Sequence, residues 1–205
     1  MTLPVALPEW LDQRMLWSIA AGIVAIAALL WAWRWYRRRR ARAAMLEMVT
    51  GGAFDFRRDV LVPDGQGGWV HADFLLLTPR GLIVLDVRDI VGNVFGGDQM
   101  TDWTVMQRAR RFTFVNPQTG LYDRIALLRA LVHEVPVDGR VLFSARAKFP
   151  KGLPRFTLML ESIRAEFPRV DRETSGRVPP AWQQDWLHVV AQLKPSSLGS
   201  PEPLF

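Results

Sequence analysis

Two carboxylates and one cation near the middle of the chain stand in runs of otherwise apolar residues. Asp73 lies in HADFLLLT, and Asp86 lies in LIVLDVR, which ends with Arg88. A charge flanked by Leu, Val and Ile is costly to bury unless another group pairs with it. Carboxylate oxygens are ligands for Mg²⁺, and a nearby cation can steady charge that develops on phosphorus. These residue types therefore suit metal-dependent phosphodiester hydrolysis.

The turn Thr78–Gly81 relates the two aspartates, because Asp73 stands as far before it as Asp86 stands after it. If the flanking strands pair across this turn, the two carboxylates come close together. Side-chain alternation then places His71 with Asp73, and Arg88 with Asp86. An Asp–Arg pair that closes the end of a sheet is the alternative, since Asp-x-Arg alone is a weak pattern.

The surrounding residues predict the elements that must hold this pair. Apolar runs separated by turns rich in Gly and Pro predict successive strands, and the run at 82–87 is typical of a strand buried on both faces. From 119 to 132 the apolar residues recur at helical spacing, which predicts a helix facing a core. Strands, a helix and a further strand predict a mixed α/β (α+β) domain around one sheet. The predicted strands are 60–62, 69–77, 82–87, 90–95, 103–106, 112–115 and 141–143.

The end of the chain contains one more amphipathic helix. After a polar, proline-rich linker, Trp182, Trp186, Val189, Val190 and Leu193 follow at helical spacing, which favours a helix packed on the domain. Residues 156–160 fit either a strand or a helix.

An uncharged stretch near the N-terminus predicts a membrane helix. Met15–Trp33 is long enough, at about 1.5 Å per residue, to cross the hydrocarbon core. Aromatic residues flank it, and six arginines lie between Arg34 and Arg42. The positive-inside rule places the N-terminus outside and the domain in the cytoplasm, anchored by a single pass in the inner (cytoplasmic) membrane. A cleaved signal peptide is the alternative, but its positive charge would precede the apolar run.

Composition limits the other classes of site. The chain of 205 residues has no cysteine, which excludes disulfides and thiolate metal sites. The net charge of +6 is concentrated before residue 45, where seven arginines oppose two acids. The remainder is close to neutral, which argues against a broad nucleic-acid-binding face. Arg108, Arg110 and Arg111, with Arg88, form either a local phosphate-facing patch or a solvated loop.

Several separated segments, in order, resemble one known family. They are VLVPDG, HADFLLLTPRGLIVLDVRDIVGNVFG, a nearby Trp, and FVNP leading into a helix. They resemble the NERD domain, the nuclease-related domain of the PD-(D/E)xK nuclease superfamily. The resemblance implies a restriction-endonuclease-like mixed sheet flanked by helices, with Mg²⁺ or Mn²⁺ as cofactor. It covers roughly residues 45–145 of the sequence.

The resemblance also assigns roles to individual residues. Asp73 matches the metal-binding Asp of the family, while Asp86 and Arg88 stand in place of its Glu and Lys. It implies catalytic roles for these three residues, with Asp73, Asp86 and Glu47 as metal ligands. Asn116-Pro117 matches the Asn-Pro before the family's helix.

Four positions depart from the family pattern. Phe74 replaces the His that usually follows the first Asp, and Gln118 is shifted from the position of the family's Gln. Asp86 is shorter than Glu by one methylene. Arg88 keeps the charge of Lys in a bulkier, forked group.

Three functions stay open on this sequence. The first is a membrane-anchored, metal-dependent nuclease acting on DNA or RNA. The second is a catalytically degenerate module that binds nucleic acid or a protein partner near the membrane, and the third is a structural scaffold. The sequence does not indicate an oligomeric state. The expected segments are an extracytoplasmic N-terminus (1–14), a transmembrane helix (15–36), an Arg-rich juxtamembrane segment (37–44), a NERD-like domain (45–165), a linker (166–180), a closing helix (181–194) and a disordered tail (195–205).

Overall fold

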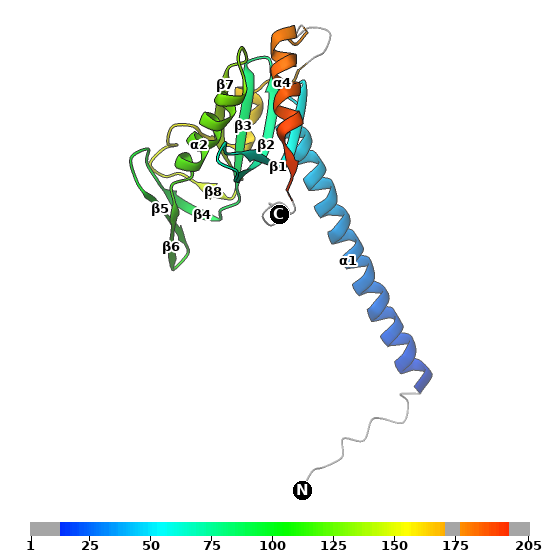
Figure 1. Cartoon of the computed structure of the whole chain (residues 1–205). Helices are drawn as coiled ribbons and strands as arrows, with labels where there is room; N and C mark the ends of the chain where they lie inside the picture. Colours follow the sequence, from blue (N-terminus) through cyan, green and yellow to red (C-terminus); the bar gives the residue numbers. More distant parts are fainter. Residues whose placement is uncertain (1–12, 171–176, 197–205) are drawn as a thin grey trace. The chain divides into compact units, whose positions relative to one another are not determined.

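A computed structural model of the chain describes residues 13–170 and 177–196 (Figure 1). The chain divides into two units, one ending at Ala44 and one starting at Met45. Helix α1 (Gln13–Thr50) runs from the first unit into the second. The expected N-terminal segment lies largely outside the described residues, as do most of the expected tail and part of the linker.

The first unit contains an apolar helical stretch. Within α1, residues Trp17–Arg37 are long and apolar enough to cross a membrane, with a mean hydropathy of 1.5. Large side chains such as Ile23 and Leu29 are exposed there, as expected of a surface that meets lipid. A helix of this kind near the N-terminus is typical of either a membrane span or a signal sequence.

The second unit is built on a mixed sheet of six strands in the order β10-β1-β2-β3-β7-β9. Strands β1, β2 and β3 form an antiparallel meander, and β3 pairs with β7 in parallel. Thr78 pairs with Gly81 and Phe74 with Leu85, which confirms the hairpin predicted across this turn. Helix α2 (Pro117–Leu131) precedes β7 (Val137–Phe143), and a parallel pair of strands requires such a crossover.

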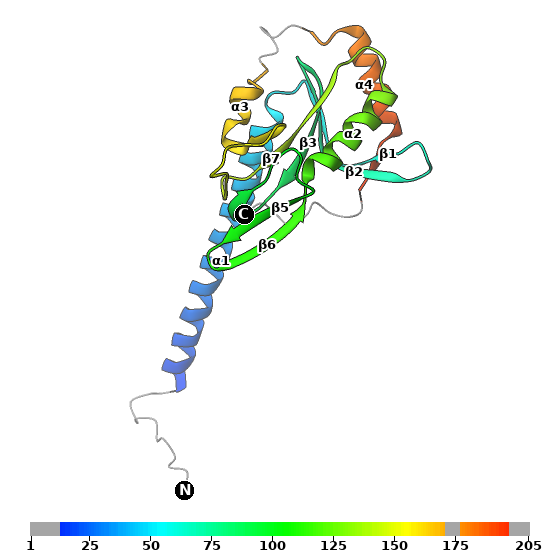
Figure 2. The ribbon, with the colours of Figure 1, turned by 90° about the vertical axis from the view of Figure 1, so that its left-hand side faces the viewer.

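Helices cover both faces of this sheet (Figure 2). On one face, α2 and α4 (Pro180–Gln192) pack against a core that includes Val84, and on the other the end of α1 and α3 (Ile163–Glu166) pack against Ile83. Every residue from Gly81 to Asp86 is therefore buried, as the apolar run predicted. The predicted closing helix is confirmed, since Trp186 and Val189 of α4 are buried.

The prediction of one sheet was wrong, because the chain forms a second, four-stranded sheet in the order β6-β5-β4-β8. The Asp73 carboxylate accepts the Val87 N–H, at 2.6 Å, in place of a carbonyl of β2. The β2–β3 ladder ends at Phe74 and Leu85, and the next strand, β4 (Gly92–Phe95), belongs to the second sheet. Strand β4 pairs with β5 in antiparallel orientation and with β8 in parallel. The strands are β1 (Asp55–Pro63), β2 (Trp69–Thr78), β3 (Gly81–Arg88), β4 (Gly92–Phe95), β5 (Asp102–Gln107), β6 (Arg110–Val115), β7 (Val137–Phe143), β8 (Ala147–Lys148), β9 (Thr157–Met159) and β10 (Lys194–Pro195).

Candidate functional site

Asp73 and Asp86 stand opposite each other where the β2–β3 ladder ends. Their neighbours Phe74 and Leu85 form the last pair of that ladder. Both aspartates are buried, with exposed fractions of 5% and 3%. Two carboxylates in so little water cannot both stay charged at low energy unless cations or hydrogen-bond donors compensate them.

The environment of Asp73 favours its neutral form. Burial raises the pKa of Asp73, and the charge of Asp86 and a hydrogen bond with Asp86 raise it further. The Val87 N–H and Arg88 act in the opposite direction. The net result is a pKa of about 7. Asp73 therefore titrates near neutral pH in the metal-free protein.

Two arginines compensate the charge of Asp86. Arg88 donates from Nη2 to Oδ2 of Asp86 at 2.7 Å, and Nη1 of Arg124 lies 3.6 Å from the same oxygen. Arg124 comes from α2 and also donates from Nε to the His71 carbonyl at 2.5 Å. Arg124 therefore ties the helix to β2 and β3 at the site.

A second group of ligand atoms lies on the other side of Asp73. Asp59, His71 and Asp73 each offer an atom, and these three atoms lie within 4.8 Å of one another. His71 Nδ1 is 3.5 Å from Asp73 Oδ1, and His71 Nε2 is 3.8 Å from Asp59 Oδ1. Asp59 has φ 51°, so the local backbone of β1 is left-handed.

This group has the donors that a divalent metal needs. Asp59 Oδ1 and His71 Nε2 are buried atoms without a hydrogen-bond partner. Such atoms are costly unless something binds them. Carboxylate oxygens and imidazole nitrogens are both groups that bind divalent metal ions in proteins. The residues therefore fit a metal, and the group is centred on Asp73.

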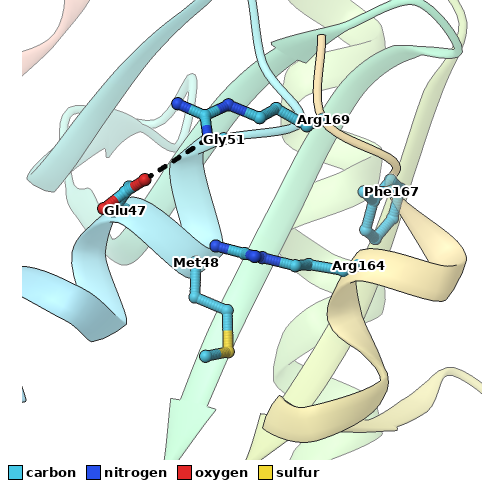
Figure 3. Close-up of a pocket in the computed structure, with 7 residues that line it drawn as sticks. Glu47, Met48, Gly51, Arg164, Phe167 and Arg169 are labelled. Atoms are coloured by element: carbon cyan, nitrogen blue, oxygen red, sulfur yellow. Dashed lines mark ion pairs between the residues drawn. The ribbon is translucent and has the colours of Figure 1, made fainter.

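Glu47, which the sequence had suggested as a third ligand, lies elsewhere. It is near the end of α1, where Met48 and Val49 pack on the face of the sheet opposite to α2. Figure 3 shows Glu47 in a small pocket beside Arg164, with an ion pair to Arg169 at 3.6 Å. The structure therefore brings Asp73, Asp86 and Arg88 together but does not bring Glu47 to them.

The start of α2 is fixed by the Asn-Pro pair and by Gln118. The Asn116 side chain caps the helix by accepting the Gln118 N–H at 2.9 Å, and Pro117 occupies the first turn. Gln118 is fully buried and donates from Nε2 to Asp98 and to the Arg155 carbonyl. The Gln118 side chain thus joins the start of the helix to two loops of the domain, and its amide donates there and not to Asp73 or Asp86.

The comparisons with known proteins agree with this architecture. The sequence model of the nuclease-related domain, NERD, matches residues 34–144, which is more than half of the chain. The chain belongs to the NERD family. The match is consistent with the PD-(D/E)xK nuclease-like superfamily. Searches of curated proteins and of solved structures give no match.

The structure shows how this NERD domain differs from the family pattern around Asp73. Phe74 stands where the family usually has His, and Phe74 packs into the core on the α1 face. An imidazole is nevertheless present beside Asp73, because His71 lies two residues earlier on the same side of β2.

Three residues of this cluster carried no role in the sequence prediction: Asp59, His71 and Arg124. Asp59 could have been found by pairing strands across the first turn, since Pro63 pairs with Trp69 and Asp59 then falls opposite Asp73. Arg124 stands next to Ile125 on the buried side of α2, which is an unusual place for a lone arginine.

Proposed function

We propose that this NERD protein is a membrane-anchored nuclease that hydrolyses phosphodiester bonds of DNA or RNA with Mg²⁺ or Mn²⁺. The observation that carries the proposal is the polar cluster around Asp73. It combines two buried carboxylates, unpartnered Asp59 and His71 atoms, and two arginines in one place. Replacing buried ion pairs with apolar residues is often neutral or stabilising, so a cluster of this kind supports a functional role.

Each residue of the cluster has a definite part in the proposal. Asp73, His71 and Asp59 would hold the metal, which supplies Lewis acidity and lowers the pKa of water when it is bound. Asp86 lies next to this group and keeps Arg88 in place through their 2.7 Å contact. The Arg88 side chain is 35% exposed, so its guanidinium can meet a phosphate from solvent while Asp86 stays buried.

The apolar stretch of α1 supports the proposed anchoring. The stretch Trp17–Arg37 is followed by Arg39 and Arg40, so positive charge gathers at its C-terminal end. By the positive-inside rule the N-terminus lies outside and the NERD domain acts at the cytoplasmic face. Nucleic acid is present on that side, which agrees with the proposed substrate.

The second candidate function is a NERD module that binds nucleic acid or a protein partner without cleaving nucleic acid. One observation favours it: Asp86 already has two guanidinium groups within 4 Å, at Arg88 and Arg124. A carboxylate compensated in this way is a poorer metal ligand than a free carboxylate, so Asp86 is a weak candidate for the second carboxylate ligand that the family resemblance implies.

The experiment that separates the two functions uses the full chain in detergent micelles, with labelled DNA and RNA and with Mg²⁺ or Mn²⁺. The nuclease proposal expects cleavage that EDTA abolishes and that Asp73→Asn and Asp86→Asn abolish as well. Asp123→Asn is the matched control, because Asp123 is exposed on the same helix as Arg124. Binding without metal-dependent cleavage would contradict the nuclease and favour the binding module.

A further inference from the structure

The hairpin of β5 and β6 exposes large apolar side chains. Strand β6 forms the edge of the smaller sheet, and five of its six residues are exposed. Phe112 is 44% exposed, and Met106 across the hairpin is 45% exposed. The inner half of the same hairpin is different, since Trp103 and Val105 are fully buried. The apolar surface at the outer half of the hairpin therefore lies outside the core, and Val115 at the other end of β6 is exposed as well.

Arginines surround these apolar side chains. Arg108, Arg110 and Arg111 are all exposed, and within the described ranges no carboxylate lies within 4 Å of any of them. Met106 pairs with Arg111 across the strands. Phe112 and Arg110 alternate with Arg111 along β6 and therefore lie on the opposite face. Each face of the tip thus carries one arginine and one exposed apolar side chain.

The turn itself contains a strained arginine. Gln107 pairs with Arg110, which leaves Arg108 and Ala109 as a two-residue loop. Arg108 has φ 54°, in the left-handed region where Gly or Asn is the usual choice for such loops. An arginine at this position adds a third exposed cation to the tip at the expense of backbone strain.

We propose that the tip of the β5–β6 hairpin docks onto anionic lipid at the surface of the membrane. The proposal rests on the proposed anchoring. Only residues 38–44 separate the end of the apolar stretch from the domain, so seven residues of chain tether the domain to the bilayer. These residues are helical in α1, so at ~1.5 Å per residue they span about 10 Å, and the domain begins within reach of the headgroups.

Lipid fits the hairpin better than nucleic acid does. Apolar side chains interleaved with arginines suit the boundary between headgroups and acyl chains, where guanidinium groups bind phosphates and Met and Phe enter the acyl region. Proteins that bind single strands instead use a basic groove with aromatic platforms. Phe112 is the single aromatic residue at the tip, and the arginines lie on two faces of a narrow hairpin.

The test uses the full chain, which has no cysteine, so Ala109→Cys gives one labelling site at the tip. The chain, labelled with an environment-sensitive fluorophore, is reconstituted into vesicles of phosphatidylcholine alone or mixed with phosphatidylglycerol. The proposal expects a blue shift and quenching by spin-labelled lipid in the mixed vesicles, both reversed by high salt. A label at Gln66→Cys, in the exposed β1–β2 turn, should show neither change.

Two triple variants test the charges. Replacement of Arg108, Arg110 and Arg111 by Gln should abolish the blue shift, whereas replacement of the same three by Lys should retain it. Equal emission in both kinds of vesicle would overturn the proposal, and so would a tip label that responds to single-stranded oligonucleotide but not to anionic lipid. An alkaline wash of the vesicles distinguishes the two failures. Removal of the chain from the vesicles contradicts anchoring. A chain that stays with the vesicles while its tip label shows no blue shift contradicts docking alone. Neither result depends on nuclease activity.

Discussion

Asp73 faces Asp86 across two antiparallel strands, and its Oδ2 accepts the Val87 N–H at 2.6 Å where the backbone ladder would otherwise continue. The same carboxylate thus ends the β2–β3 pairing and lies beside the unpartnered atoms of Asp59 and His71. The Asp73 side chain therefore takes part both in the strand pairing and in the proposed metal site. Substitutions at Asp73 should alter the stability of the domain as well as metal binding.

The first prediction concerns the pH dependence of the metal-free protein. The pKa of Asp73 is raised from 3.8 to about 7 in the folded state. Between these two values the folded state binds a proton that the unfolded state has lost, so stability falls as pH rises from about 4 to 7. Above pH 7 this loss is complete.

Thermal unfolding of the full chain in EDTA, followed against pH, measures this effect. Asp73→Asn removes the titrating group, so the variant should lose less stability than the wild type between pH 5 and pH 8. Parallel curves for the two proteins would show that Asp73 does not titrate in this range.

The second prediction concerns Asp185, a buried acid of α4. Its Oδ2 accepts three backbone N–H groups, from His133 at 3.0 Å, Glu134 at 2.7 Å and Val135 at 2.9 Å. Asp185→Ala should lower the free energy of unfolding by roughly 2–4 kcal/mol, because three buried donors lose a charged acceptor. Urea denaturation measures the loss. Asp102→Ala, at an exposed acid, should change stability by about 0.5 kcal/mol or less.

The same contacts set the pH range in which Asp185 stabilises the fold. Burial raises the pKa of Asp185, but the three N–H groups outweigh it and hold the pKa below 3.8. The contribution of Asp185 is therefore complete above the unfolded value and is lost as pH falls through the lower folded value. A pH-independent difference between wild type and Asp185→Ala in acid would contradict this assignment.

The third prediction concerns the arginine that replaces the lysine of the family. If Arg88 stabilises charge on phosphorus, Arg88→Ala should lower kcat by about 10²–10³, the usual effect of losing one such donor. Arg88→Lys should keep most of the activity, because the positive charge stays beside Asp86. Arg58→Ala is the control, since Arg58 is exposed on β1. Equal activity of Arg88→Ala and wild type would remove Arg88 from the catalytic group.

Much of the main sheet, and the approach of Asp73 to Asp86, could be predicted from the sequence. A four-residue turn between two apolar runs determines the β2–β3 register, because a slip by one residue would turn every apolar side chain to the wrong face. The helix 119–132 and the closing helix follow equally from apolar spacing, and both lie within a residue or two of α2 and α4.

Other parts depended on contacts between distant segments. The approach of Arg124 to Asp86 requires the packing of α2 on the sheet, which periodicity alone does not describe. The second sheet brings β4 beside β8 from a distant part of the sequence, and local strand patterns do not reveal that pairing. Glu47 was assigned by resemblance, yet Met45, Met48 and Val49 form the buried stripe of that helix end, and Glu47 is off that stripe.

The proposed function depends most on whether Asp73, with His71 and Asp59, holds a divalent metal. Titration of the full chain with Mn²⁺, followed by electron paramagnetic resonance of the free ion, tests it directly. We expect one saturable site in the wild type and in Asp123→Asn, and loss of that site in Asp73→Asn. Equal Mn²⁺ binding by Asp73→Asn and the wild type, or no saturable binding by the wild type, would contradict the claim.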